Sequence, residues 1–136
     1  MKQIVCFALL ICSLLPFCSS CSSKNKPEYE KYDRIFLSKL DRDGKLDSIH
    51  ISELICCYYG GCYYYTVQYT KDSNDNQYEL LYIFRNDDLE IFYSVKKPEE
   101  CMQFFPDSYQ RFLTAKNKGE KKEYTAEEIQ SMIDKY

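Results

Sequence analysis

The chain has 136 residues, with 18 basic and 21 acidic side chains and a formal net charge of −3. This length fits one domain of roughly 100–150 residues. A composition of 45% hydrophobic and 29% charged residues excludes a wholly disordered or collagen-like chain. The mild acidity argues against nucleic acid as a partner, because nucleic-acid-binding proteins usually carry a basic excess on one face.

The first twenty residues have the pattern of an export signal. Lys2 supplies a positive charge, and residues 4–17 form an almost wholly apolar run without a charged side chain. This run is shorter than the roughly 20 apolar residues that a membrane-spanning helix needs. Ser19 and Ser20 then supply the small residues of a signal-peptide cleavage site.

Cys21 follows directly, and residues 18–21 resemble the signal of bacterial lipoproteins. In that signal a small residue precedes a cysteine that is lipidated and becomes the mature N-terminus. Ser19 and Ser20 match the pattern, whereas Cys18 stands where an aliphatic residue is usual. The resemblance implies an envelope protein anchored in the membrane by acyl chains on Cys21. Ordinary secretion and a retained anchor are the alternatives.

The resulting organisation is a signal peptide, a lipidated cysteine with a polar tether, and a single α+β domain, over residues 1–20, 21–30 and 31–136. Five segments of the domain have the pattern of strands, namely 33–40, 48–59, 62–70, 77–85 and 89–95. Gly60 and Gly61 predict a hairpin, because glycine tolerates the positive φ of tight turns. Short turns between successive strands predict an antiparallel meander.

The C-terminal part of the chain predicts helices. Residues 107–116 can form one helix, and residues 117–123 have the composition of a charged linker. Thr125 and Glu128 form a capping box that begins a second helix. Strands followed by helices predict an α+β fold, in which one or two C-terminal helices pack on one face of an antiparallel meander of about five strands.

The cysteines of the predicted domain suit disulfide bonds, because the chain is expected outside the cytoplasm. They are Cys56, Cys57, Cys62 and Cys101. A four-residue loop over residues 58–61 would place Cys57 opposite Cys62, so the preferred pairing is Cys57–Cys62 with Cys56–Cys101. The other two pairings stay open. A zinc site is a weaker interpretation, because adjacent cysteines fit poorly with the usual C-x2–4-C spacing.

After the first predicted strand, three acidic residues surround Gly44, namely Asp41, Asp43 and Asp47. They resemble the D-x-D-G-x-x-D calcium loops of EF-hands and of strand-flanked FG-GAP and VCBS-type repeats. The resemblance implies calcium as a cofactor, bound by the three carboxylates and the Lys45 carbonyl. Lys39 and His50 stand where an EF-hand has Asp and Glu, which favours the strand-flanked form. The alternative is a solvated Asp-Gly turn without an ion.

Six tyrosines lie between residues 58 and 69. Alternation along a strand places Tyr64 on the opposite face from Tyr63 and Tyr65. Tyr58 and Tyr64 are therefore the candidate partner-binding residues, and packing within the core or on the sheet is the alternative.

The sequence contains no G-x-S-x-G, H-E-x-x-H or phosphate-loop motif. We therefore expect a non-enzymatic envelope lipoprotein that binds an envelope or secreted protein. An inhibitor or immunity-type protein is the concrete version of this expectation. The alternative is a structural or ligand-binding subunit of a surface assembly, with calcium in the loop at residues 41–47.

Replacement of the lipidated cysteine tests the export prediction. Cys21→Ser should move the protein from the membrane into the soluble fraction, because the acyl chains that hold it are lost. Intact mass spectrometry of the wild type should show an acylated chain that begins at Cys21. An unmodified wild-type chain that begins at Cys21 and does not sediment with membranes would indicate simple secretion instead.

Overall fold

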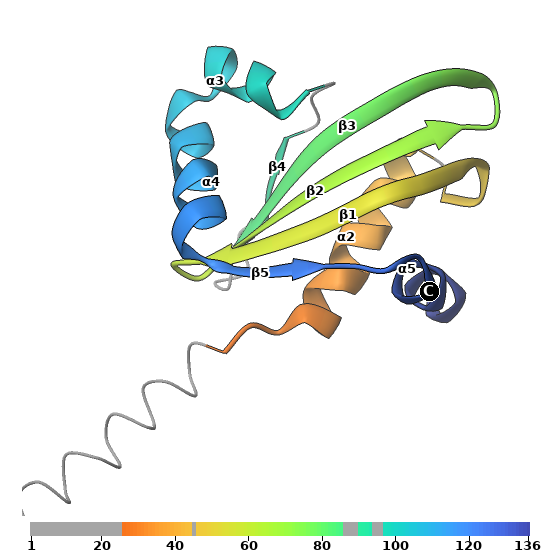
Figure 1. Ribbon diagram of the computed structural model, residues 1–136, viewed down its shortest axis with the longest axis horizontal. Coiled ribbons are helices and arrows are strands. Elements are labelled where there is room, and N and C mark those ends of the chain that lie inside the picture. The colour runs from red at the N-terminus through yellow and green to blue at the C-terminus, as the bar shows by residue number, and fades with distance from the viewer. Residues whose placement is uncertain (1–25, 45, 86–89, 94–96) are drawn as a thin grey trace, which may run out of the picture.

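The computed structural model describes residues 26–44, 46–85, 90–93 and 97–136. An antiparallel five-stranded sheet carries helices on both faces (Figure 1), which confirms the predicted α+β class. The predicted lipoprotein signal, Cys21 and Lys45 lie outside the described residues. Within the described ranges, no helix is both long and apolar enough to cross a bilayer.

The described elements follow one another in a simple order. They are α2 (Tyr29–Gly44), the 3-10 turn η1 (Leu46–Ser48), β1 (Ile49–Tyr59), β2 (Cys62–Lys71), β3 (Asn74–Arg85), β4 (Glu90–Tyr93), the 3-10 turn η2 (Pro98–Glu100), α3 (Cys101–Phe104), α4 (Pro106–Lys118), β5 (Glu120–Glu123) and α5 (Ala126–Lys135). Across the sheet the order is β4-β3-β2-β1-β5. The meander thus has four strands rather than about five, and β5 adds to the outer edge of β1 (Figure 1).

The prediction of a strand at residues 33–40 is wrong, because these residues belong to helix α2. This helix begins at Tyr29, inside the segment predicted as a polar tether. Its buried hydrophobic residues are Tyr32, Phe36, Leu37 and Leu40, which recur at the three- and four-residue spacing of one helix face. A short apolar run fits either period, and only the full-length stripe from residue 32 distinguishes a helix from a strand.

The predicted charged linker, residues 117–123, also contains structure, since Glu120–Glu123 form the edge strand β5. Gly119 joins α4 to this strand where the backbone passes close to β1. A Cβ atom at Gly119 would lie 2.5 Å from the Tyr58 carbonyl oxygen and 2.6 Å from the Ala115 carbonyl oxygen. Glycine is therefore required here for close approach, which allows α4 to lie against the sheet.

The predicted hairpin at Gly60 and Gly61 is confirmed, with φ angles of 60° and 78°. The turn holds two residues, not the four expected, because Tyr59 pairs with Cys62 in the register of β1 and β2. Cross-strand partners share a sheet face, and successive residues alternate between faces. The turn therefore determines which side chains of both strands meet which helices.

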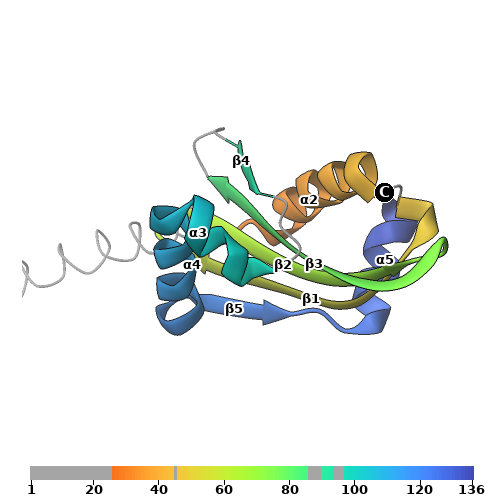
Figure 2. The ribbon, with the colours of Figure 1, turned by 90° about the horizontal axis from the view of Figure 1, so that it is seen from above.

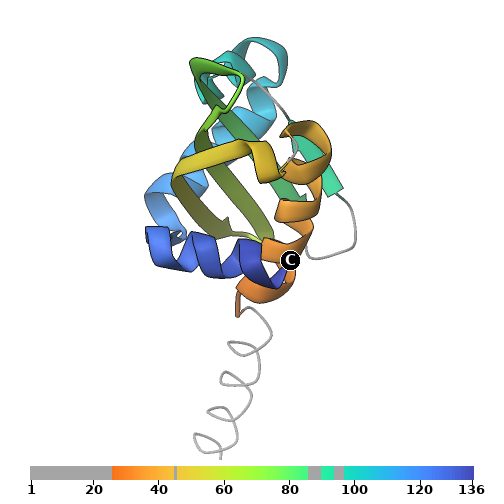
Figure 3. The same ribbon diagram turned by 90° about the vertical axis from the view of Figure 1, so that its right-hand side faces the viewer.

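One face of the sheet forms the larger core beneath α2 and α5 (Figure 2). Aromatic rings stack across this interface, with ring centroids 3.9 Å apart for Tyr32–Tyr63 and 4.8 Å apart for Phe36–Tyr65. Helices α3 and α4 cover the opposite face, on the other side of the sheet from α2 (Figure 3). The two C-terminal helices, α4 and α5, thus lie on different faces of the sheet. The sequence predicted that such helices pack on the same face.

A buried carboxylate connects three separate segments on the α2 side. Asp33 of α2 is only 8% exposed. Its Oδ1 accepts hydrogen bonds from the Tyr65 hydroxyl at 2.7 Å and the Tyr124 hydroxyl at 2.5 Å. Burial raises the pKa of Asp33, and the two tyrosine hydrogen bonds oppose this shift by stabilising the carboxylate. Helix α2, strand β2 and the segment after β5 are therefore held together at one polar point.

Two substitutions of Asp33 measure separately how its buried charge and its hydrogen bonds affect the free energy of unfolding. Its folded pKa lies above the unfolded value of about 3.9, so the folded chain binds this proton more tightly. The contribution of Asp33 to the free energy of unfolding therefore falls as the pH rises from the unfolded pKa through the folded pKa. Asp33→Asn keeps an acceptor oxygen and should remove that decline.

Asp33→Ala should instead lower the free energy of unfolding by about 2–5 kcal/mol, because two buried hydroxyls lose their acceptor. Urea unfolding followed by circular dichroism at about pH 4 and about pH 7 measures both effects. An alanine variant as stable as the wild type, or an asparagine variant with the wild-type pH dependence, would contradict this assignment.

Candidate functional site

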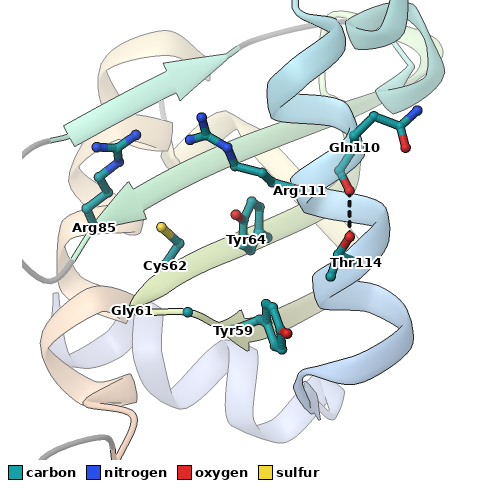
Figure 4. Close-up of a pocket in the computed structure, with 9 residues that line it drawn as sticks. Tyr59, Gly61, Cys62, Tyr64, Arg85, Gln110, Arg111 and Thr114 are labelled. Carbon is teal, nitrogen blue, oxygen red and sulfur yellow. Dashed lines mark hydrogen bonds between the residues drawn. The ribbon is translucent and has the colours of Figure 1, made fainter.

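A pocket of about 590 Å³ opens at the end of the sheet that carries the β1–β2 turn. Strands β1, β2 and β3 and helix α4 all contribute to its walls (Figure 4). We term it the arginine pocket and define it by Tyr59, Cys62, Tyr64, Arg85, Arg111 and Thr114. Its volume lies in the range of about 300–1,000 Å³ that is usual for ligand sites.

The strand register builds the floor of the arginine pocket. Cys62 pairs with Tyr59 on one side and with Arg85 on the other, so these three residues form a row across one sheet face. Tyr64 lies two residues further along β2 and therefore faces the same way. Helix α4 is seated on this face by Phe112 and Ala115, which are buried in the smaller core cluster. This places Arg111 beside the row.

The two arginines extend from β3 and α4 toward the same side of the pocket, with Cys62 and Tyr64 beneath them (Figure 4). Among the described residues, the ion pairs are His50–Asp72, Lys121–Glu123 and Lys122–Glu128, so neither arginine has a carboxylate partner there. The Nε atom of Arg85 is buried and has no hydrogen-bond partner among those residues. The pocket therefore contains two positive charges that no carboxylate among the described residues pairs with.

Tyr64 is the polar group at the floor of the pocket. Burial raises its pKa, the neighbouring Cys62 thiol raises it further, and Arg111 and Arg85 lower it, with a resulting pKa of about 12. Tyr64 is therefore protonated at neutral pH, and its hydroxyl can donate a hydrogen bond. The arrangement of two guanidinium groups with this hydroxyl is suited to holding an anionic group.

The predicted partner-binding residues have different positions in the structure. Tyr58 is 8% exposed and packs on the Tyr63 ring in the larger core, so little of its side chain is accessible to a partner. Tyr64 is also buried, but it lines the arginine pocket. Sequence reasoning missed Tyr59, which is 41% exposed, and it missed Arg85 and Arg111. The register of β3 on β2 would have indicated Arg85, since it places this residue opposite Cys62.

The register also bears on the predicted disulfides. Cys57 pairs with Tyr64, so Cys57 and Cys62 are diagonal neighbours on one face. Diagonal neighbours are about 7–8 Å apart, beyond the usual Cα separation of about 4.4–6.8 Å in a disulfide. Cys56 belongs to the core beneath α2, whereas Cys101 belongs to the core beneath α4. All four thiols are free in the structure, and the preferred pairing stays a prediction without geometric support.

The predicted calcium loop is not flanked by strands, because its first half is the last turn of α2. Asp41 accepts a hydrogen bond from the Leu46 amide at 3.0 Å and one from the Tyr136 hydroxyl at 3.3 Å. Asp43 accepts a hydrogen bond from the Tyr82 hydroxyl at 3.5 Å, and Asp47 lies in η1. The described part of the chain holds no group of three or more acidic, histidine or cysteine residues that could bind a metal. Calcium binding at Asp41, Asp43, Lys45 and Asp47 stays a prediction.

No protein-family model, curated protein or solved structure matches this chain.

Thiol accessibility tests the geometry of the pocket. Cys62 is partly exposed in the pocket, whereas Cys56, Cys57 and Cys101 are buried. Burial also raises the pKa of these three thiols, which reduces their reactive thiolate form. N-ethylmaleimide should therefore modify Cys62 at least about tenfold faster than the other three, as measured by peptide mass spectrometry. Equal modification of Cys57 and Cys62, or an unreactive Cys62, would contradict the described pocket.

Proposed function

We propose that this protein is an exported, lipid-anchored binding protein that engages another protein through the arginine pocket and the surface beside it. In its concrete form it is an inhibitor or immunity-type protein that occupies a site on its partner. The proposal rests on one observation: two arginines that have no ion pair among the described residues lie next to a group of exposed apolar side chains.

The exposed apolar side chains lie on and just after α3. Met102, Phe104 and Phe105 are large hydrophobic residues with exposed side chains, and Phe104 is 64% exposed. We term these three residues the α3 patch. The amide of Gln110, which also lines the pocket, donates a weak hydrogen bond to the Met102 sulfur at 3.8 Å. The patch and the pocket therefore adjoin each other.

The composition of this surface is that of a protein interface. Aromatic residues, methionine and arginine are enriched where proteins bind one another, and arginine and tyrosine are frequent among the residues that contribute most affinity. Exposed Tyr59 in the pocket adds a further aromatic contact. The described lining of the pocket contains no histidine, aspartate or glutamate that could act as a general base. Both points support binding over proton-transfer chemistry.

Site-specific photocrosslinking tests this proposal. Benzoylphenylalanine in place of Tyr59 or Phe104 should give a discrete covalent adduct with a protein in the cells that export the chain. The same probe in place of Ser131, which is exposed on α5, is the matched control and should give none. Absence of adducts from both test positions, or equal adducts from position 131, would contradict the proposal.

A further inference from the structure

The arginine pocket carries positive charge on a chain whose net charge is −3. Acidic residues are therefore plentiful, yet none among the described residues pairs with Arg85 or Arg111. A buried charged donor without an acceptor is costly, because it loses water without gaining a hydrogen bond. The Nε of Arg85, which has no hydrogen-bond partner in the described part of the chain, is such a donor. An oxyanion that accepted hydrogen bonds from this guanidinium group would offset this cost.

The two arginines are held by independent parts of the fold. Arg85 lies opposite Cys62 in the sheet, and the Tyr32 hydroxyl donates a hydrogen bond at 2.6 Å to its carbonyl oxygen. Arg111 precedes Phe112, whose buried ring fastens α4 to the sheet. Both backbones are thus fixed before any ligand arrives. The planar guanidinium fork of arginine matches the paired oxygens of a carboxylate or phosphate.

The rest of the pocket favours an oxyanion attached to carbon over a small inorganic ion. A volume of about 590 Å³ is many times that of one water-sized group, so a lone phosphate would leave most of it unfilled. The exposed Tyr59 side chain supplies aromatic surface, which an aliphatic or peptide group can cover. The α3 patch continues the same surface outside the pocket.

We propose that the arginine pocket seats an acidic segment of the protein partner, with one side-chain carboxylate held between Arg85 and Arg111. This inference rests on the proposed function, since it names the chemistry that the partner presents. The segment lies over Tyr59, and apolar residues of the same partner cover the α3 patch. Opposite charge also steers the partner toward the pocket.

A labelled peptide measures the recognition of carboxylates directly. Fluorescein-labelled triglutamate is titrated with the full chain in detergent, and fluorescence anisotropy reports binding. Triglutamine of the same length is the neutral control, and inorganic phosphate at matched ionic strength is the competitor. Triglutamate should bind, with an affinity that falls as salt is added. Triglutamine and phosphate should neither bind nor displace it at equal concentration.

Arginine substitutions assign the binding to the pocket. Arg111→Gln and Arg85→Gln should each weaken triglutamate binding by about tenfold or more, because each removes a charge-assisted hydrogen bond. Arg34→Gln removes the same charge from an exposed position on α2 and should change the affinity by less than about twofold. Arg111 is exposed, so its substitution tests the site even if Arg85→Gln destabilises the fold. Arg111→Lys keeps the charge without the fork and should give an intermediate affinity.

Three results would overturn the inference. These are triglutamine that binds as tightly as triglutamate, an Arg34→Gln loss of affinity as large as that of Arg111→Gln, and displacement of the peptide by phosphate at equal concentration. The crosslinking experiment separates this inference from the proposed function. Adducts at positions 59 and 104 without triglutamate binding would refute only the acidic segment. Arginine-dependent triglutamate binding without adducts would refute the protein partner and leave a site for small carboxylates.

Discussion

The two-residue turn at Gly60 and Gly61 is the constraint on which the rest of the structure depends. Both residues have positive φ, which only glycine adopts without strain in this sequence context. The turn pins the register of β1 on β2, and a slip of one residue would move every side chain of a strand to the other face. Tyr63 and Tyr65 would then leave the core beneath α2, and Cys62 and Tyr64 would leave the pocket.

This register divides the sheet into two faces with different roles. The face beneath α2 and α5 buries stacked aromatic rings and the Asp33 carboxylate with its two tyrosine donors. The face beneath α4 has a smaller apolar cluster and ends at the arginine pocket. Most of the buried aromatic residues lie on the first face, whereas the second face carries at its edge two arginines that have no ion pair among the described residues.

The candidate site is a product of three constraints that act together. The register aligns Tyr59, Cys62 and Arg85, the packing of Phe112 and Ala115 orients α4, and Gly119 allows the end of that helix to approach β1. None of these residues makes a site alone. Together they place two guanidinium groups and a tyrosine hydroxyl around one opening, which is the basis of the proposed recognition of an acidic partner.

Local pattern in the sequence determined the hairpin between β1 and β2, the strand β3, helix α4 and the capping box of α5, because each depends on interactions between residues close in the chain. The local pattern did not predict α2, because a short apolar run fits both the helix period and the strand period. It did not predict β5 either, because these charged residues form a strand only by pairing with the edge of β1. The meeting of Arg85 with Arg111, and the separation of Cys56 from Cys101, were decided by tertiary structure alone. Both depend on which sheet face a helix covers, and no local periodicity encodes that choice.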